Sequence, residues 1–180
     1  MITLKYVGDG ELKKAHETDI GFDVSANKLE IVYEDGYSIL EKDEMTLENI
    51  RASLASHAYL VKKLKFDTGV AIEPEGKFWV MAAANSRVCK TNFVLNNGVG
   101  IIDPSYRGTI RFIYANTLTR GYDCAEDILM LCKTCGQLIP MTDISYSTVA
   151  QKVEYLSETE RDKGGFGSTS EDDNSKTNDR

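Results

Sequence analysis

The sequence is poor in several residue types, and these shortages exclude some classes of protein. Its 180 residues include only four cysteines, three prolines, two histidines and one tryptophan. Four cysteines are too few for a disulfide-stapled scaffold and suit a reducing compartment. No stretch approaches the roughly 18 consecutive apolar residues of a membrane-spanning helix, and the N-terminus lacks the basic and apolar regions of a secretory signal. We therefore expect no membrane association and a cytoplasmic location, in a cell or in a virus-infected host.

Positive charge is also in short supply. Lysine and arginine number 21 against 28 acidic residues, which gives a net charge of −7. No broad basic surface is then available to neutralise a nucleic-acid backbone, so binding of duplex nucleic acid is disfavoured, whereas a small local anion site is not. What remains is globular: 42% of residues are hydrophobic and 27% charged, in a chain of the length of one domain.

Most of the chain has the pattern of short strands separated by turns. β-Branched, aromatic and alternating residues mark the strands, and Gly, Pro, Asn and Asp mark the turns. Many short strands at this spacing predict an all-β sandwich or barrel. The expected strands cover residues 2–6, 28–33, 66–72, 78–83, 94–95, 109–114, 128–132, 138–141 and 149–155.

One segment breaks this pattern and predicts a single helix over about residues 46–60. Apolar residues such as Leu47, Ile50 and Leu54 fall at three- and four-residue spacing, and Thr46 stands where an N-cap belongs. The helix either covers a sheet edge or a barrel end, or offers a surface to a protein partner, and the sequence leaves both roles open.

The last part of the chain differs in composition from the rest. Residues 157–180 are rich in small polar residues and show no periodicity, which predicts a flexible arm after a barrel domain over residues 1–156. Within the arm, Phe166 stands among glycines, followed by Ser168 and Thr169. Free NH groups and hydroxyls suit an anion and the Phe ring suits a stacked base, although a plain linker has a similar composition.

A second cluster of reactive and permissive residues covers residues 97–108. If residues 99–102 lie at or beside a strand hairpin, Gly98 and Gly100 let a planar ligand approach the backbone NH and C=O groups directly. Such an arrangement can recognise the edge of a nucleobase. Asp103 and Tyr106 follow, a carboxylate near an aromatic ring, which fits a base that orients water or a group that binds sugar hydroxyls. The alternative is an ordinary Asp-Pro turn in which Asp103 bonds its own backbone.

Two further groups could hold a metal ion. Asp23 follows Asp19 in the segment 18–24, and magnesium prefers one or two carboxylates together with water and phosphate oxygens. Cys132 and Cys135 form a C-x-x-C pair that could bind zinc with Cys124 and a distant histidine. We favour the plainer interpretation that the pair are small buried residues on a strand, because the sequence has no second C-x-x-C.

Five short segments occur in a fixed order along the chain. They are residues 19–23, residues 66–70 with 74–76, residues 97–108, residues 136–139, and Arg161 with residues 164–169. In this order they resemble the five motifs of the homotrimeric dUTP diphosphatase (dUTPase) family, and the resemblance spans nearly the whole chain. The Gly-Phe-Gly-Ser-Thr end is what separates dUTPases from the related dCTP deaminases.

The resemblance implies a jelly-roll-like β-barrel that forms a homotrimer, with each active site shared between subunits and closed by the arm of another. It implies that Asn97 and the adjacent backbone, including Gly100, bind uracil. Tyr106 would lie under the deoxyribose, where a 2′-hydroxyl would clash. Asp103 would position the attacking water and reach the 3′-hydroxyl.

For the phosphates, the resemblance implies contacts from Gln137 and Ser86 and a contact from Arg161 to the terminal phosphate. Asp23 would support Mg²⁺ through water, and Phe166 would cover the uracil. The arm residues expected to close the site are Phe166, Gly167, Ser168 and Thr169.

Two motifs depart from the family pattern. The second usually reads Arg-Ser-Ser or Arg-Ser-Gly, and counting back from Asp103 without gaps places Asn85 at the arginine and Ser86 at the phosphate-binding serine. Arg87 then stands two residues along an extended strand, on the side of Asn85, from which it would reach the phosphates. Placing Arg87 at the arginine instead would require a gap and lose the serine, so we favour the first register. In the fourth motif, residues 132–135 replace Gly-Asp/Glu-Arg-Ile, so an arginine is missing there.

The residues and the resemblance together predict a Mg²⁺-dependent dUTP diphosphatase that releases dUMP and pyrophosphate by attack of water on the α-phosphorus. Two alternatives stay open. One is a dCTP deaminase of the same barrel, and the other is a dUTP-binding sensor that engages a protein partner, for which the altered second motif is the only support.

Overall fold

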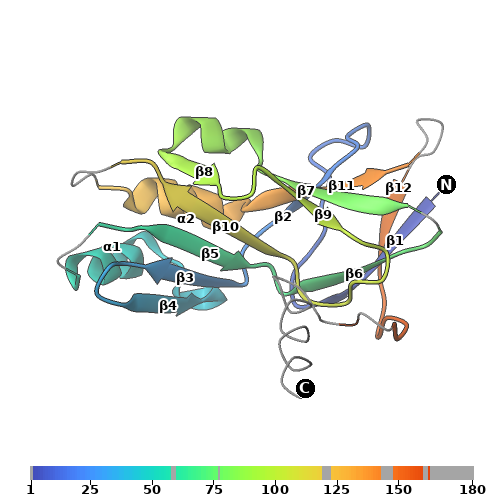
Figure 1. The fold of residues 1–180 in the computed structure, drawn as a ribbon, viewed down its shortest axis with the longest axis horizontal. Helices are drawn as coiled ribbons and strands as arrows, with labels where there is room; N and C mark the ends of the chain where they lie inside the picture. Colours follow the sequence, from blue (N-terminus) through green and yellow to red (C-terminus); the bar gives the residue numbers. More distant parts are fainter. Residues whose placement is uncertain are drawn as a thin grey trace, which may run out of the picture.

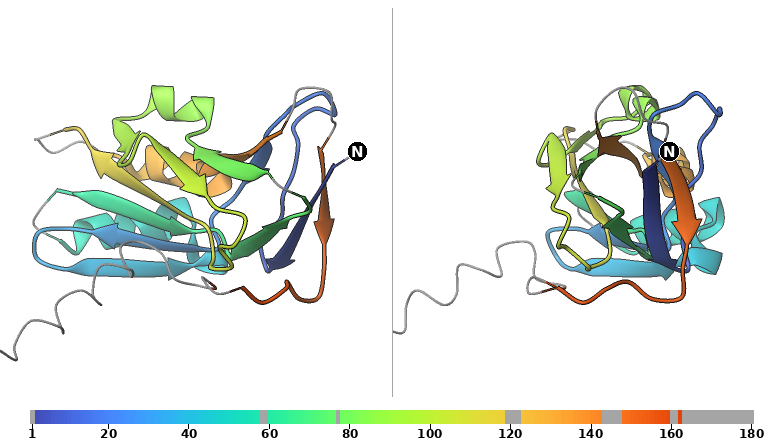
Figure 2. Two further views of the ribbon diagram at one scale, coloured as in Figure 1. Left: turned by 45° about the vertical axis from the view of Figure 1, so that its right-hand side comes forward. Right: turned by 90° about the vertical axis from the view of Figure 1, so that its right-hand side faces the viewer.

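The computed structural model describes residues 2–57, 60–76, 78–118, 123–142, 148–159 and Asp162. Three β-sheets surround one apolar interior, and the helices α1 and α2 lie in the half of the molecule opposite the N-terminus (Figures 1 and 2). This arrangement confirms the predicted all-β, jelly-roll-like barrel. Among the described residues, no helix is long and apolar enough to cross a membrane.

The strands are ordered β12-β1-β6, β4-β3-β5-β10-β8 and β2-β11-β7-β9 in the three sheets. β12 runs parallel to β1, and the other pairs are antiparallel. The bounds of the strands are β1 Ile2–Gly8, β2 Phe22–Val24, β3 Lys28–Val32, β4 Tyr37–Glu41, β5 Lys63–Asp67, β6 Val70–Pro74, β7 Trp79–Ala83, β8 Phe93–Leu95, β9 Val99–Ile102, β10 Arg111–Asn116, β11 Gly136–Met141 and β12 Thr148–Lys152. The α-helices are α1 Leu47–Ala55 and α2 Ala125–Lys133, and the 3₁₀ helices are η1 Lys42–Glu44 and η2 Ser86–Lys90.

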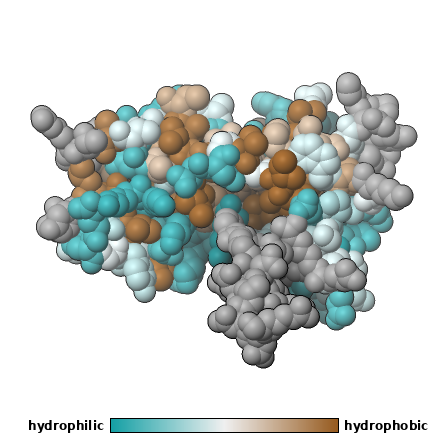
Figure 3. All heavy atoms as spheres, viewed as in Figure 1, coloured by the Kyte–Doolittle hydropathy of each residue, from teal (hydrophilic) through white to brown (hydrophobic). Residues whose placement is uncertain are grey.

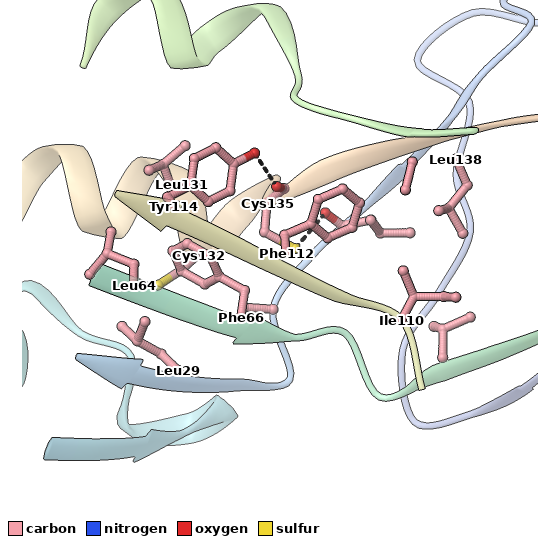
Figure 4. Packing of buried hydrophobic residues seen from close by; sticks show 14 of the residues in the cluster. Leu29, Leu64, Phe66, Ile110, Phe112, Tyr114, Leu131, Cys132, Cys135 and Leu138 are labelled. Carbon is pink, nitrogen blue, oxygen red and sulfur yellow. Dashed lines mark hydrogen bonds between the residues drawn. The ribbon is translucent and has the colours of Figure 1, made fainter. Parts of the chain in front are cut away.

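The five-stranded sheet shows why its residues form strands. Alternate side chains of β3, β5 and β10 point into the core, where they are fully buried. On the outer face, Lys28 Nζ lies 2.7 Å from Glu41 Oε1 and Lys65 Nζ lies 2.7 Å from Glu30 Oε1. Such exposed ion pairs add little stability, but their charges keep the outer face of the sheet hydrated. The inward residues of the three strands are Leu29, Ile31, Leu64, Phe66, Phe112 and Tyr114, all of which except Ile31 are labelled in Figure 4.

The predicted strand over residues 66–72 is two strands. The chain leaves β5 at Asp67 and enters β6 at Val70, and Gly69 adopts a positive φ of 64° between them. The buried Thr68 hydroxyl donates to the Ile110 carbonyl at 2.9 Å and accepts from the Val70 NH at 3.2 Å. Because glycine takes this backbone conformation without strain, the chain can pass here from the five-stranded sheet to the sheet that holds β1.

The helix expected at residues 46–60 is confirmed but shorter. Thr46 accepts a hydrogen bond from the Asn49 NH, as an N-cap does, and the helix ends at Ala55 with Ser56 as its C-cap. Ile50 is fully buried. α1 packs against α2, so part of its apolar face is already covered within the chain.

The prediction of a strand over residues 128–132, and of a single helix, is wrong. These residues belong to α2, whose buried side chains include Ile128, Leu131 and Cys132 at helical spacing. A five-residue apolar run fits a buried helix segment as well as a buried strand, so periodicity alone could not distinguish them. The N-cap, Cys124, makes no side-chain capping bond, which removed the usual signal of a helix start.

Replacing Tyr114 with Phe tests the buried polar contact at the centre of the core. The Tyr114 hydroxyl donates to the Cys135 carbonyl at 2.7 Å (Figure 4), and burial raises the pKa of Tyr114, which keeps the phenol protonated. Tyr114→Phe removes the donor from a buried carbonyl, so the free energy of unfolding should fall by about 1–3 kcal/mol in urea at one fixed protein concentration.

The matched control is Tyr37→Phe, because Tyr37 is 64% exposed on β4. It should change the free energy of unfolding by less than about 0.5 kcal/mol. Equal losses in the two variants would show that the buried hydrogen bond has no special weight.

Candidate active site

A cavity of about 160 Å³ lies between β9 and β10. Four residues that the sequence singles out line it together: Asn97, Gly100, Asp103 and Tyr106. Apolar side chains such as Phe112 form much of the remaining wall. A small cavity with apolar walls and a few convergent polar groups is typical of a site for a small planar ligand.

A tight turn places Asn97 and β9 at the mouth of this cavity. Gly98 adopts a φ of 68°, its NH donates to the Leu95 carbonyl at 3.0 Å, and the Val99 NH donates to the Asn97 carbonyl at 2.7 Å. The expected turn is therefore present, but it does not close a hairpin. β8 pairs with β10 and β9 pairs with β7, so the turn carries the chain from one sheet to another.

Tyr106 forms part of the cavity wall and is 9% exposed. Its hydroxyl donates to the Thr109 carbonyl at 3.2 Å. A Cβ at Gly108 would lie 2.3 Å from the same hydroxyl, so only glycine fits beside the ring. Burial raises the pKa of Tyr106, so the hydroxyl stays a neutral donor.

A second polar group lies around Asp23 on β2. Asp23 Oδ1 accepts from Asn85 Nδ2 at 3.0 Å and from Gln137 Nε2 at 2.8 Å. Asn85 is buried and also caps η2 by accepting from the Arg87 NH at 3.0 Å. One carboxylate oxygen therefore orients both amides that the sequence assigns to the second and fourth motifs.

The expectation that Arg87 lies on an extended strand beside Asn85 is wrong. Strand β7 ends at Ala83, and residues 86–90 form η2, because the Asn85 side chain caps that turn. Ser86 and Arg87 are exposed at its start. The guanidinium reaches Thr134 instead, where Nη1 lies 3.0 Å from the hydroxyl oxygen. The backbone differs from the expectation, but Arg87 still lies beside the fourth motif.

These two groups lie on opposite faces of one sheet. Leu138, Ala82 and Gly100 form a row across β11, β7 and β9, and Leu138 is fully buried in the core. The adjacent row holds Gln137 and Val99, and Val99 is 50% exposed. Directly paired residues share a face and successive residues alternate, so Gln137 faces outward while Gly100 faces the cavity.

Arg107 is a buried residue that the sequence reasoning passed over. Its guanidinium donates to the carbonyls of Pro104 at 2.6 Å and Ser157 at 2.9 Å, and its backbone NH donates to the Asp162 carbonyl at 2.6 Å. Glu73 accepts from the Ser157 NH at 2.9 Å and lies 3.8 Å from Arg107. An arginine directly after the Asp-Pro-Ser-Tyr turn was the available signal for this role.

The same contacts determine the pKa of Glu73. Burial alone would raise it, but the two hydrogen bonds from Ser157 and the charge of Arg107 outweigh burial and lower the pKa below its ordinary value. The carboxylate is then ionised at neutral pH and holds the chain at Ser157. The remaining arm residues predicted for the site, Arg161, Phe166, Gly167, Ser168 and Thr169, lie outside the described residues.

The C-x-x-C cysteines are buried, but Cys132 lies in α2 rather than on a strand. Burial raises the pKa of Cys132 to about 12 and that of Cys124 to about 11. Cys135 Sγ donates to the Val24 carbonyl at 3.4 Å, and only a protonated thiol can make this hydrogen bond. Within the described part of the chain, no group of three or more His, Cys, Asp or Glu side chains could hold a metal ion.

Several curated proteins are similar to this chain in sequence. The chain is 38% identical over 112 residues to the deoxyuridine 5′-triphosphate nucleotidohydrolase of Escherichia phage T5. This alignment covers 60% of this chain and 69% of that protein. The protein of the same name from Hydrogenobaculum is 31% identical over 109 residues, which covers 60% of this chain and 71% of that protein. No model of a protein family matches the chain.

Solved dUTPase structures give a weaker likeness. The EIAV enzyme aligns with a TM-score of 0.43 and 20% identity, over 85% of this chain and 99% of that one. A mutant dUTPase from phage phi11 of S. aureus aligns with a TM-score of 0.43 and 15% identity, over 81% and 90%. The sequence relatives alone carry the assignment: the chain belongs to the deoxyuridine 5′-triphosphate nucleotidohydrolase (dUTPase) family.

Arg107→Lys tests the attachment of the segment at Ser157. Lysine keeps the charge, but one ammonium group cannot replace a planar guanidinium that donates to several carbonyls at once. We expect a loss of about 1–3 kcal/mol in the free energy of unfolding and faster proteolytic cleavage between residues 153 and 159, read by mass spectrometry.

Arg51→Lys is the matched control, because Arg51 is half exposed and lies 3.5 Å from Glu126. It should cost less than about 1 kcal/mol and leave the cleavage rate unchanged. Unaltered cleavage in Arg107→Lys would show that the segment is held by other contacts.

Proposed function

We propose that this protein hydrolyses dUTP to dUMP and pyrophosphate. Membership of the dUTPase family supports the reaction, and one observation supports its location. Asn97, Gly100, Asp103 and Tyr106, which match the family's third motif, line one cavity with apolar walls. The motif residues are therefore assembled where a base and a sugar would fit together.

The reaction is an attack of water on the α-phosphorus. A bond forms between the water oxygen and phosphorus, and the bond to the bridging oxygen breaks, so that pyrophosphate leaves. The proton of the water passes to the Asp103 carboxylate and then to solvent. The protein's main contribution is to hold the triphosphate and the water in line, because positioning and electrostatics dominate phosphoryl chemistry.

Selectivity for dUTP would come from the shape of the cavity. Asn97 and the backbone beside Gly100 would pair with the edge of uracil, and the tight wall would leave no room for a methyl group. Tyr106 is fixed by its own hydrogen bond to the Thr109 carbonyl and by the close contact at Gly108. A ring held in this way cannot move aside for a 2′-hydroxyl, which would exclude ribose.

A magnesium ion fits the residues around Asp23. Asp23 Oδ1 already accepts two amide hydrogen bonds, so only its second oxygen would be available to an ion. Magnesium commonly takes one or two carboxylates together with water and substrate phosphates, and Asp23 would hold it through water. When bound, the ion would neutralise charge that develops on the phosphates.

A complete site would need more than one copy of the chain. Gly100 and Gln137 lie on opposite faces of the sheet and are separated by two strand spacings, about 10 Å. Within a single chain the sheet itself lies between these two positions. We propose a homotrimer in which the cavity of one subunit meets the Asp23, Asn85 and Gln137 group of another, with Ser86 and Arg87 beside the phosphates.

The outer face of the same sheet offers a surface for this contact. Beyond Gln137 its rows become apolar, with Met81 and Trp79 on β7 and Ile101, 63% exposed, on β9. In Figure 3, apolar surface gathers over the region of β7, β8 and β9, whereas the region of β3, β4 and β5 is mostly hydrophilic. An apolar face of this kind is typical of contacts between subunits.

Pyrophosphate release measured over a panel of nucleoside triphosphates tests the proposal. Release from dUTP alone is the expected result. Ammonia release from dCTP would indicate a deaminase, and tight binding of dUTP without turnover would indicate a sensor, so both outcomes would overturn the proposed reaction.

Asp103→Asn should lower the turnover of dUTP roughly 10²–10⁴-fold while leaving the affinity for a non-hydrolysable dUTP analogue nearly unchanged. The amide keeps the shape of the carboxylate but cannot accept the proton. Asp43→Asn, on η1, removes the same charge elsewhere and should leave turnover unaltered. More than about a tenth of wild-type turnover in Asp103→Asn would show that this carboxylate is not the base.

Deleting residues 164–180 should leave the barrel folded but lower the turnover of dUTP, because Phe166, Ser168 and Thr169 would no longer close the site. The control ends the chain after Ser170 and should retain activity. A melting temperature that falls together with activity would instead assign the arm a structural role.

A further inference from the structure

The segment over residues 66–70, which leads to the second motif, has no part in the proposed reaction, yet it is bonded to one wall of the cavity. The Thr68 NH and hydroxyl both donate to the Ile110 carbonyl, at 3.1 and 2.9 Å, and the Ile110 NH donates to the Val70 carbonyl at 2.8 Å. Residues 109–111 are part of the cavity lining. The turn between β5 and β6 therefore fixes the backbone of this wall.

Asp67 adds side-chain hydrogen bonds to this contact. Asp67 Oδ2 accepts from the Thr109 hydroxyl at 3.0 Å and from Arg111 Nε at 2.9 Å. Asp67 Oδ1 accepts from the Gly69 NH at 2.9 Å. The carboxylate thus joins three donors, one in its own turn and two in the residues on either side of Ile110. Hydrogen bonds to an ionised group are shorter and stronger than those between neutral groups.

Thr109 connects Asp67 to Tyr106. The Thr109 hydroxyl is held by Asp67, and the Thr109 carbonyl accepts from the Tyr106 hydroxyl at 3.2 Å. Gly108, between them in the sequence, has no room for a Cβ beside the same Tyr106 hydroxyl. A shift of Thr109 would therefore move the acceptor that fixes the Tyr106 ring, so the position of the ring depends on Asp67.

The ion pair between Asp67 and Arg111 contributes little stability by itself, because the Arg111 side chain is 54% exposed. Glu30 and Lys65 form a partly exposed pair of the same kind on the same sheet. Within the described ranges, however, Glu30 makes no side-chain hydrogen bond to the cavity lining. Asp67 differs because it holds a residue of that lining. A binding group keeps its productive geometry only when its neighbours hold it by packing and hydrogen bonds.

We propose that Asp67 is a positioning residue for the selection of the sugar. It holds Thr109, which in turn holds Tyr106 in the place where a 2′-hydroxyl would clash. In naming the sugar the proposal rests on the proposed function, which assigns Tyr106 to the deoxyribose. A pocket rejects one additional hydroxyl by only roughly 10²-fold, and it does so only while its wall cannot move aside. A looser Tyr106 should therefore admit ribose.

Thr109→Val tests this role without removing a charge. Valine has nearly the same shape and keeps the carbonyl, but it has no hydroxyl for Asp67. The ratio of kcat/KM for dUTP to kcat/KM for UTP should fall roughly tenfold, because UTP is admitted more readily, while kcat for dUTP changes less than about threefold. Thr109→Ser keeps the hydroxyl and should keep this selectivity ratio within about twofold of the wild-type value.

The matched control is Thr117→Val. The Thr117 hydroxyl donates to the Asn92 carbonyl at 2.9 Å, on an exposed residue just beyond the end of β10. Loss of this hydrogen bond should leave the selectivity ratio unchanged. An equal fall of the ratio in the control would overturn the proposal.

Asp67→Asn tests the same contact from its other side. An amide has one oxygen and one NH₂ group, so it cannot accept from Gly69 and also from Thr109 and Arg111. The selectivity ratio should fall at least as far as in Thr109→Val, and the double variant should match Asp67→Asn, because both changes break one path. Glu30→Gln removes a carboxylate from an ion pair of the same sheet and should leave the ratio unchanged.

Both Thr109→Val and Asp67→Asn must lower the selectivity ratio. A constant ratio in either variant would break the path through Thr109 and overturn the proposal, whatever happens to the melting temperature. A lower melting temperature with a constant ratio would show that these hydrogen bonds support only the fold.

Calorimetric titration of the intact protein with dUMP and with UMP separates the role of Asp67 from the proposed reaction, because binding needs no turnover. A wild type that does not hydrolyse dUTP but binds dUMP more tightly than UMP, with a smaller preference in both variants, would overturn the reaction and retain the role of Asp67. A wild type with no preference for the deoxy sugar in either measurement would overturn that role.

Discussion

The pleat of one β-sheet constrains how this protein can build a site. Successive residues of a strand point to opposite faces, so Gln137 and its neighbour Leu138 on β11 are committed to different sides of the same sheet. Gly100, on the inner side, lines the cavity together with Asn97, Asp103 and Tyr106, and the outer side carries the amides held by Asp23. Within one chain no side-chain rotation brings the two sides together, so the proposed site, which uses both, would draw on a second copy.

The altered second motif has a physical rationale in this arrangement. Asn85 is buried and joins Asp23 to the NH of Arg87. A neutral amide meets these two partners without the desolvation cost of burying a guanidinium there. The positive charge moves two residues along, to an exposed position from which it reaches Thr134, where the fourth motif has lost its own arginine. The two departures from the family pattern are therefore neighbours in space.

How much of the molecule the sequence predicts depends on how local the signal is. The Thr46 cap, the turn at Gly98 and the third motif are encoded within a few residues, and they appear in the structure where expected. The helix at 125–133 depends on burial that a short apolar run does not reveal. The contacts of Thr134 and Arg107 depend on partners that are 47 and 50 residues away in the sequence. The placement of Gln137 and Gly100 on opposite faces of the sheet can be seen only once the strand register is known.

The contacts that hold Ser157 and Thr159 to the barrel also limit how far the residues after them can reach. Thr159 donates to the Ser105 carbonyl, so the chain is fixed to the barrel at that point. Phe166 follows seven residues later in the sequence, and at about 3.3–3.6 Å per residue the tether spans at most roughly 25 Å. Any base that Phe166 covers must lie within that radius of Thr159, extended by the length of the Phe side chain. In the proposed homotrimer, the length of this short connection would limit which cavity each arm could serve, as much as the chemistry of the arm.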